Sequence, residues 1–230
     1  MLTQLQLLGQ NGDHLVAIDH CQLESRCALA LRQLQDAAAL AGFNLQVASG
    51  WRSFERQLLI FNRKARGERP LLDSQGKQLS ADRLNDQQKL EAILQWSALP
   101  GMSRHHWGTD LDIYDANAIS SESLKLEPWE YDKAGPNGPL SQWLSTHMHT
   151  FGFYRPYQQQ LGGVQPEPWH LSFAPVSAPA LQAFEVDALA TLLEHTDIEL
   201  KSAILDDLEM IASRYLHKIS PVPENLSHAL

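Results

Sequence analysis

Two strings that combine histidine with a carboxylate, far apart in the chain, constrain the fold more than any other feature. His105 lies seven positions before Asp112, and Glu167 lies three positions before His170. Asp112 falls inside an alternating apolar string typical of a strand, and His170 opens a second such string. If these polar side chains act together, the two strands must be brought into one sheet although they are distant in sequence.

Two imidazoles and one carboxylate form a three-ligand set of the kind found in catalytic zinc sites, where the fourth position is left for water. Zinc lowers the pKa of that water toward about 7, and a carboxylate that is not a ligand can accept its proton and pass it to a leaving amine. His105, Asp112 and His170 are therefore candidate ligands of one zinc ion, and Glu167 is the candidate base. Such strings also occur by chance, so the residue types alone leave a coincidental match open.

The other histidines are interpreted as ordinary residues. His147 and His149 look like a metal pair, but two positions apart on a helix they face different sides. His106 directly follows His105, so its side chain is expected to point elsewhere, toward packing or substrate. The remaining histidines are expected at the surface or hydrogen-bonded within the protein: His14, His20, His195, His217 and His228.

Arg52 lies at a predicted corner between a strand and a helix that Ser53 can cap. One interpretation is a surface charge at the start of the helix. With Trp51 before it and Gln57 one and a half turns later, Arg52 could instead hold a carboxylate or stabilise an oxyanion. Both interpretations stay open at this point.

Three motifs occur in the order Ser-Gly-aromatic-Arg-Ser-x-x-x-Gln, Ser-x-His-x-x-Gly-x-x-x-Asp and Glu-x-x-His. Their positions are Ser49, Gly50, Trp51, Arg52, Ser53, Gln57, Ser103, His105, Gly108, Asp112, Glu167 and His170. Together they resemble the zinc D-alanyl-D-alanine peptidase family, which includes the VanX dipeptidases and the VanY carboxypeptidases. The resemblance spans residues 49–173. It implies zinc bound by the two histidines and Asp112, and Glu167 as catalytic base.

The same resemblance implies that Arg52 stabilises the developing oxyanion and that Gln57, Ser103 and Trp169 contact substrate. The chain departs from the family pattern at Trp51, where the family has tyrosine, and at Asp110, where it has a small residue. Alternation places Asp110 on the same strand face as Asp112. Asp110 could orient a ligand imidazole from behind, bind a substrate ammonium or reach solvent.

The family fold is α+β, a small and mainly antiparallel sheet that carries the zinc site and is packed by helices. We expect residues 1–230 to form one zinc peptidase domain, with a family core of about 49–173 and a helical C-terminal addition at 177–218. If the added helices cover the cleft, they would favour short substrates.

Apolar spacing and turn residues predict the elements in more detail. A hairpin is expected over 5–18 with its turn at 10–13, an exposed excursion over 67–80, an irregular loop over 127–139 and a loose tail after Pro221. Strands are expected at 45–48, 111–114 and 170–173, and helices at 23–40, 53–65, 85–96, 140–151, 181–195 and 198–217.

Composition narrows the class of partner. The net charge of -9 argues against a basic surface that gathers nucleic acid or anionic membrane. The N-terminus does not read as a signal peptide, and no run approaches the ~18 apolar residues of a membrane span. Cys21 and Cys27 are too far apart for a disulfide and are expected to be buried thiols. A cytoplasmic location in a bacterial cell is the expectation.

The expected activity is metal-assisted hydrolysis of a small peptide or muropeptide, most simply as a D-alanyl-D-alanine carboxypeptidase. Relatives include dipeptidases and endolysin-like peptidoglycan endopeptidases, so the length of the substrate is left open, as are its stereochemistry and the oligomeric state. A rival hypothesis is a non-catalytic binding domain stabilised by zinc, as the distantly related Hedgehog signalling domains suggest. Its usual mark is loss of the base, whereas Glu167 is present.

Overall fold

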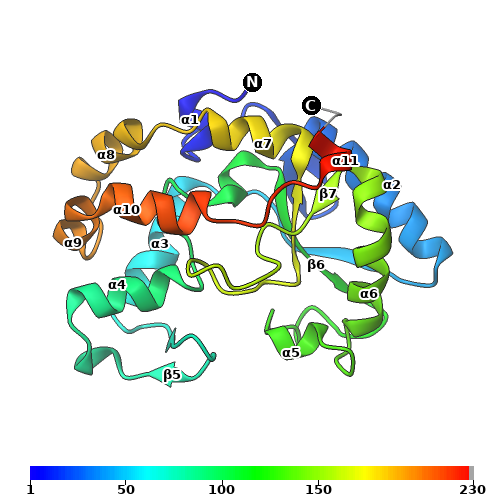
Figure 1. The fold of residues 1–230 in the computed structure, drawn as a ribbon, viewed down its shortest axis with the longest axis horizontal. Helices are drawn as coiled ribbons and strands as arrows, with labels where there is room; N and C mark the ends of the chain where they lie inside the picture. Colours follow the sequence, from blue (N-terminus) through cyan, green and yellow to red (C-terminus); the bar gives the residue numbers. More distant parts are fainter. Residues whose placement is uncertain (228–230) are drawn as a thin grey trace.

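The computed structural model describes residues 1–227. His228, expected to be an ordinary surface residue, lies outside the described residues. The fold is built on a four-stranded antiparallel sheet with helices on both sides (Figure 1). This arrangement confirms the predicted α+β class.

The strands of this sheet come from distant parts of the chain. Their order is β3 (Leu45–Ser49), β6 (Asp110–Asp115), β8 (His170–Phe173) and β7 (Phe153–Tyr154). In the register, Asp112 lies opposite Ser49 on one side and His170 on the other. The expected strands 45–48, 111–114 and 170–173 are confirmed, and the short β7 is an addition that the sequence did not predict.

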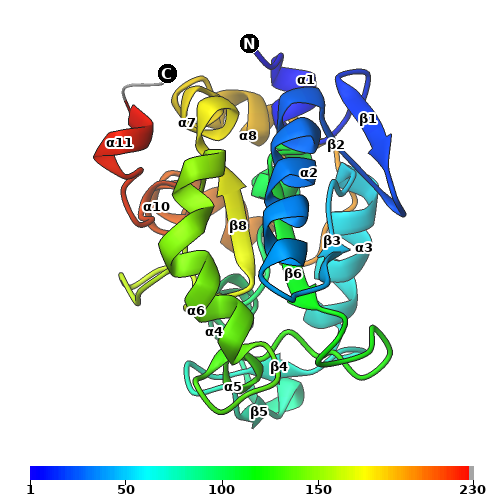
Figure 2. The same ribbon diagram turned by 90° about the vertical axis from the view of Figure 1, so that its right-hand side faces the viewer.

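Alternation along the strands divides the sheet into an apolar and a polar face. Leu111, Ile113 and Leu171 belong to a buried cluster with residues of α2 (Ser25–Leu40), α6 (Gly138–His147) and η3 (Met148–Phe151). Figure 2 shows α2 and α6 side by side over this face. Asp112 and His170 alternate with these residues and therefore point to the opposite face.

A second apolar cluster lies on the other side of the molecule and joins the N-terminal helix, the central helices and the C-terminal helices. Its elements are α1 (Gln4–Leu7), α3 (Phe54–Ala65), α4 (Asp86–Leu94), η2 (Arg104–Trp107), α7 (Ala174–Gln182), α8 (Val186–Glu194), α9 (Lys201–Asp206), α10 (Leu208–Ala212) and the π-helical turn η4 (Ser213–His217). The polar face of the sheet borders a cavity that residues of α3 and of the segment after α4 also line.

The remaining elements are short: the strand pair β1 (Leu15–Ile18) and β2 (Cys21–Glu24), the pair β4 (Leu71–Leu72) and β5 (Gln78–Leu79), η1 (Ala81–Arg83), α5 (Pro128–Tyr131) and α11 (Glu224–Ser227). Thus the predicted excursion 67–80 contains a small hairpin, and the predicted irregular loop 127–139 contains a helical turn that begins at a proline. Cys21 and Cys27 are not joined in a disulfide; Cys27 is buried as expected, whereas Cys21 is only partly buried.

The predicted turn of the N-terminal hairpin was wrong. The hairpin turns at Asp19, which has a φ of 50°, and not at 10–13. Thr3 and Gln6 form a reciprocal capping box, so the residues before the predicted turn begin a helix instead of a strand. Asp13 donates its backbone N–H to the Asn11 side chain, which makes a local turn that leads into β1.

The predicted C-terminal helices were only partly right. The predicted helix 181–195 contains α8, but the structure adds α7, which starts directly after β8 and includes Pro179. The predicted helix 198–217 is divided into α9, α10 and η4, with a break at Asp207. None of the helices among residues 1–227 is long and apolar enough to cross a membrane alone; the bent pair of α7 and α8, at 75° to one another, meets that test only jointly.

Candidate active site

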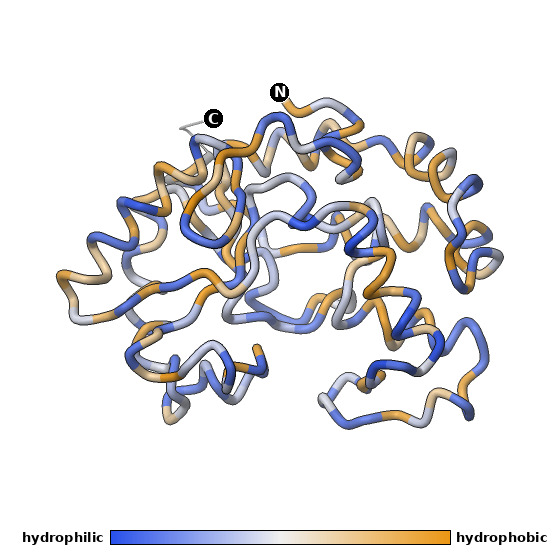
Figure 3. The backbone as a smooth tube through the Cα atoms, turned by 180° about the vertical axis from the view of Figure 1, so that it is seen from behind, coloured by the Kyte–Doolittle hydropathy of each residue, from blue (hydrophilic) through white to orange (hydrophobic). Residues whose placement is uncertain are grey.

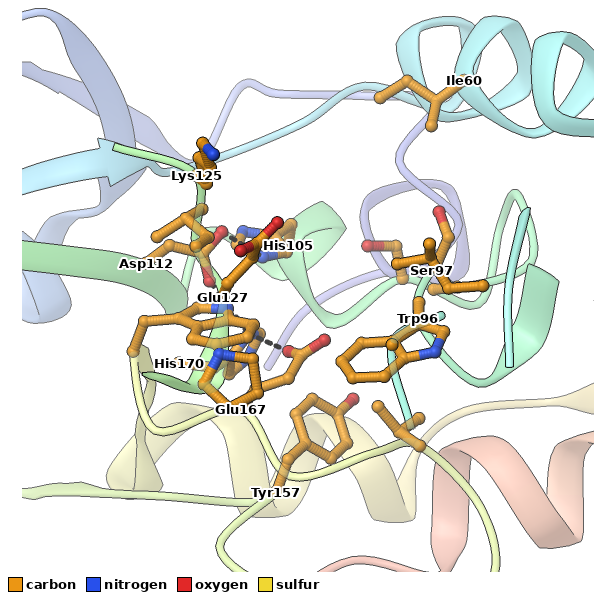
Figure 4. A pocket seen from close by; sticks show the side chains of 18 of the residues that line it. Ile60, Trp96, Ser97, His105, Asp112, Lys125, Glu127, Tyr157, Glu167 and His170 are labelled. Atoms are coloured by element: carbon orange, nitrogen blue, oxygen red, sulfur yellow. Dashed lines mark ion pairs between the residues drawn. The ribbon is translucent and has the colours of Figure 1, made fainter. Parts of the chain in front are cut away.

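Three side chains from three segments converge on the polar face of the sheet. His105 comes from η2, Asp112 from the centre of β6 and His170 from the first position of β8. One ligand atom of each lies within 4.8 Å of the others, and all three side chains are buried. The two imidazole rings meet edge to face, with centroids 4.9 Å apart. Figure 4 shows the three side chains gathered on one side of a cavity.

The spacing of these atoms fits a tetrahedral cation. His105 Nε2 is 3.4 Å from Asp112 Oδ2, and His170 Nδ1 is 3.2 Å from Asp112 Oδ1. Two ligands each about 2.0–2.1 Å from a tetrahedral zinc ion would lie about 3.3 Å apart. Asp112 Oδ1 and His170 Nδ1 are also buried without a hydrogen-bond partner, which is costly unless a cation contacts both. The donor set therefore fits one zinc ion.

Each ligand imidazole is held by its second nitrogen. His105 Nδ1 lies 2.9 Å from the Gly50 carbonyl oxygen, and as the donor it leaves Nε2 toward Asp112. His170 Nε2 lies 2.9 Å from Asp110 Oδ1, and as the donor it leaves Nδ1 toward Asp112 and Glu167. Such contacts set the tautomer and the orientation of a ligand. Of the three roles left open for Asp110, its complete burial supports the first, orientation of an imidazole.

The charge of Asp110 is compensated by Arg104, which the sequence analysis missed. Arg104 Nε donates to Asp110 Oδ1 at 2.8 Å, and the hydroxyls of Thr109 and Ser172 donate to Oδ2. Burial alone would lower the pKa of Arg104, but the adjacent Asp110 outweighs it and raises that pKa. The sequence could have indicated Arg104, because an inward-facing carboxylate at Asp110 needs a buried cation. Arg104 is the nearest arginine or lysine in the sequence.

The electrostatics of the triad also favour a cation. Burial would lower the pKa of His170, but its hydrogen bond to Asp110 and the nearby carboxylates of Asp112 and Glu167 prevail and raise it. Burial would raise the pKa of Asp112, but His105 and His170 hold it below its usual range. In this structure the carboxylates favour a protonated His170. A divalent cation would supply that positive charge and leave neutral imidazoles as ligands.

Glu167 lies beside the triad without belonging to it. Its Oε2 is 3.4 Å from His170 Nδ1, and its side chain is 13% exposed, so it is partly open to the cavity. Arg155 fixes the loop that carries it, because its guanidinium donates to the Pro168 carbonyl and to Ser145 Oγ on α6. Tyr157 packs edge-on against His170, with ring centroids 4.9 Å apart. Neither Arg155 nor Tyr157 had a signal in the sequence motifs.

Arg52 is aimed into the cavity by two neighbours. Its guanidinium donates to Gln57 Oε1 at 2.8 Å and to Ser49 Oγ at 3.0 Å. Gln57 in turn donates to the Ala98 carbonyl and is completely buried. This geometry corrects the expectation for Gln57: its amide is occupied by the protein, so it positions Arg52 and does not itself reach substrate. Burial lowers the pKa of Arg52, opposed by Asp112 and Glu167.

The triad opens into a cavity of about 580 Å³. Ser103 and Trp169, two of the predicted substrate contacts, line it together with Arg52 and Glu167. In Figure 4, Trp96 and Ser97 lie across the cavity from Asp112 and His170, with Glu167 between the two sides.

Two polar segments border this cavity, the hairpin of β4 and β5 and the segment of α5 (Figure 1). The tube in Figure 3 is mostly blue or pale along both. The C-terminal helices were expected to favour short substrates if they covered the cleft, but among the described residues none after His170 lines the cavity.

Among residues 1–227, the other histidines do not join the triad. His106 is buried, with Nδ1 donating to the Arg52 carbonyl and Nε2 accepting from Gly101 N–H, so of the two expected roles it has the packing one. Burial lowers its pKa to about 3. His147 stacks on Trp143 and donates to the Trp143 carbonyl, and neither His147 nor His149 belongs to the three-residue group that could hold a metal ion.

Gly108 determines the geometry between His105 and Asp112, because its φ of 71° ends η2 and starts the approach to β6. A Cβ here would lie 2.8 Å from Glu24 N and 2.5 Å from a Leu15 methyl. We expect Gly108→Ala to reduce the free energy of unfolding by clearly more than Gly42→Ala, since Gly42 has a φ of 92° but open space around it. The left-handed backbone alone costs about 1–2 kcal/mol. Urea unfolding of both variants measures the difference, and equal losses would contradict the steric argument.

The comparisons with known proteins agree with this geometry. A family model described as VanY, D-alanyl-D-alanine carboxypeptidase, matches residues 20–176, which is more than half of the chain. The chain belongs to the VanY family. An uncharacterised protein of Haemophilus influenzae is 37% identical to it over 117 residues, covering 50% of this chain and 89% of the relative.

Two solved structures of VanY proteins resemble the fold of this family member. One is VanYB in complex with D-alanine-D-alanine, with a TM-score of 0.52 and 25% identity over 81% of this chain and 92% of that one. The other is a variant of the vancomycin-resistance D,D-pentapeptidase VanY in complex with Zn(II). It has a TM-score of 0.52 and 25% identity, covering 85% of this chain and 91% of that one. Both likenesses confirm the family that the three motifs predicted.

Proposed function

We propose that this protein is a zinc-dependent D-alanyl-D-alanine carboxypeptidase that acts on peptidoglycan-type peptides. The observation that carries the proposal is the convergence of His105, Asp112 and His170 at zinc-ligand spacing beside the free carboxylate of Glu167. Membership of the VanY family supports a peptidase of peptidoglycan peptides, and the zinc and D-alanine-D-alanine complexes of two relatives support the metal and the substrate.

Each residue of the site would have a separate role in amide hydrolysis. A zinc ion bound by the triad would polarise the scissile carbonyl and lower the pKa of water. Glu167 would accept a proton from the attacking water and deliver it to the leaving amine. Arg52, held by Ser49 and Gln57, would donate to the oxygen on which negative charge develops. Ser103 and Trp169 would contact the peptide in the cavity, and Asp110 would hold His170 in its ligating tautomer.

Two features favour an enzyme over a binding domain in which zinc is only structural. Glu167 is present and lies 3.4 Å from a ligand imidazole, where a base is needed. The triad also opens into a cavity, whereas structural zinc sites are closed by a fourth protein ligand. An endolysin-like endopeptidase would use the same residues, so the difference lies in the substrate and has to be measured.

The decisive measurement is release of D-alanine from D-alanyl-D-alanine and from a stem pentapeptide that ends in D-alanyl-D-alanine. We expect cleavage by zinc-loaded protein, loss of cleavage to background after chelation, and recovery when zinc is added back. Preference for the pentapeptide identifies a carboxypeptidase and preference for the free dipeptide a dipeptidase. Stoichiometric zinc without cleavage of either would support the binding domain. The expected cytoplasmic location stays a prediction that cell fractionation would check.

A further inference from the structure

The lining of the cavity includes cationic side chains to which the proposed chemistry assigns no role. Lys64 lies in the last turn of α3, one turn after Ile60, and both face the cavity together with Arg69, which follows the helix. The opposite wall carries Lys125 and Glu127, whose charges offset one another. In a chain with a net charge of -9, an excess of cations on one wall of the substrate cavity calls for a ligand with negative charge.

The carboxylates nearest in sequence are already engaged by other groups. Glu68 pairs with Arg63 and Arg66, at 3.8 and 4.0 Å. Asp73 Oδ1 accepts the backbone N–H groups of Gln75 and Lys77 in the hairpin turn. Among residues 1–227, the side chains of Lys64 and Arg69 form no ion pair or hydrogen bond. Their charges are therefore available to a bound molecule.

Lys64 is only half-buried, yet its ammonium is strongly desolvated. Burial lowers the pKa of Lys64 to about 8. The positive charges of Arg69 and Arg52 lower it further, and the negative charge of Glu167 opposes the shift. The group is still mostly protonated at pH 7, but its charge has lost water without gaining a partner. An anion that enters the cavity would recover that cost, since charge-assisted hydrogen bonds strengthen where water is scarce.

We propose that Lys64, with Arg69, forms a subsite for a second carboxylate of the peptide, carried by a residue that precedes the cleaved bond. A carboxypeptidase substrate has one residue after that bond and several before it, so we assign the larger extension of the cavity, which is lined by residues of α3 and of the β4–β5 hairpin, to the preceding residues. This inference deepens the proposed function and takes from it that the ligand is a peptide. It makes Lys64 a residue that selects acidic over neutral substrates.

The test uses acetylated pentapeptides ending in D-alanyl-D-alanine, with glutamate or glutamine at one of the three preceding positions. Their affinities are measured by calorimetry on the zinc-loaded Glu167→Gln protein, so that no peptide is consumed. We expect one glutamate peptide to bind about tenfold or more tightly than its glutamine twin. Adding Lys64→Met should bring that ratio close to one and Lys64→Arg should keep it. Lys77 is an exposed lysine in the turn between β4 and β5 and does not line the cavity, so Lys77→Met should leave the ratio unchanged.

Three results would overturn the subsite. They are equal binding of every glutamate and glutamine pair, a glutamate preference that survives Lys64→Met, or a Lys64 effect confined to peptides with a free rather than an amidated C-terminus. The last would mean that Lys64 holds the terminal carboxylate. Turnover of the glutamine peptides by the unmodified protein tests the peptidase separately. Selective binding of a glutamate peptide without turnover would support the subsite and reject the proposed peptidase activity. Turnover without a glutamate preference would support the peptidase activity and reject the subsite.

Discussion

Replacing Glu167 with glutamine is expected to lower peptide turnover about a thousandfold or more while zinc remains bound. The two side chains have nearly the same shape, but the amide cannot accept a proton, and loss of a general base costs roughly 10²–10⁴ in rate. Glu167 is not one of the three converging ligand residues, so zinc stoichiometry and affinity should be retained. The measurements are kcat on the stem pentapeptide and zinc content after dialysis.

Glu127 offers a matched control, because it lines the same cavity but its carboxylate accepts from the Trp129 indole. Glu127→Gln should keep turnover within a few-fold of the original protein. If Glu167→Gln kept most of its activity, Glu167 would lose its role as base. If it lost zinc as well, Glu167 would have to be regarded as a ligand.

Replacing Asp110 with alanine is expected to destabilise the protein by about 3–5 kcal/mol, the usual cost of leaving a buried charge without its partner. Arg104 is 2% exposed and Asp110 is fully buried, so water cannot compensate the guanidinium once the carboxylate is gone. His170 would also lose the acceptor that fixes its tautomer, which should weaken zinc binding about 10–100-fold. Urea unfolding of metal-free protein and zinc competition with a chelator measure the two effects separately.

The double variant Asp110→Ala with Arg104→Met separates the charge from the orientation of the imidazole. Removing both charges should recover most of the lost stability, because no unpaired ion remains in the interior. Zinc affinity should stay low, since His170 still lacks its acceptor. A double variant that bound zinc like the original protein would show that Asp110 serves only to neutralise Arg104.

The sequence predicted the central strands and the members of the site because both rest on local signals. Alternation around Asp112 identified β6, and the same alternation placed Asp110 beside it, where both carboxylates contact His170. Ser53 was expected to cap the helix after Arg52, and its hydroxyl accepts from Arg56 N–H at the start of α3. The roles of the site residues stay predictions until the variants are measured.

The features that were missed depend on contacts between distant segments. Gln57 matched a motif, but its complete burial follows from Ala98, forty-one positions later, which no local pattern reveals. The N-terminal turn was misplaced because an Asn-Gly pair competed with a capping box whose helix is secured by packing of Leu7 in the core. The helix α7 was missed because Pro175 and Pro179 disfavour a helix as a local pattern, whereas the chain forms one directly after β8.

Because β6 has an apolar and a polar face, insertions and deletions close to this strand are restricted. Inserting one residue between Gly108 and Asp110 would exchange the faces, turning Leu111 and Ile113 toward the cavity and the carboxylates into the layer beneath α2. Insertions in the hairpin of β4 and β5 leave that alternation untouched. Length variation among related sequences should therefore accumulate at the borders of the cavity, so that new substrate preferences arise there while the strand that carries Asp112 keeps its spacing.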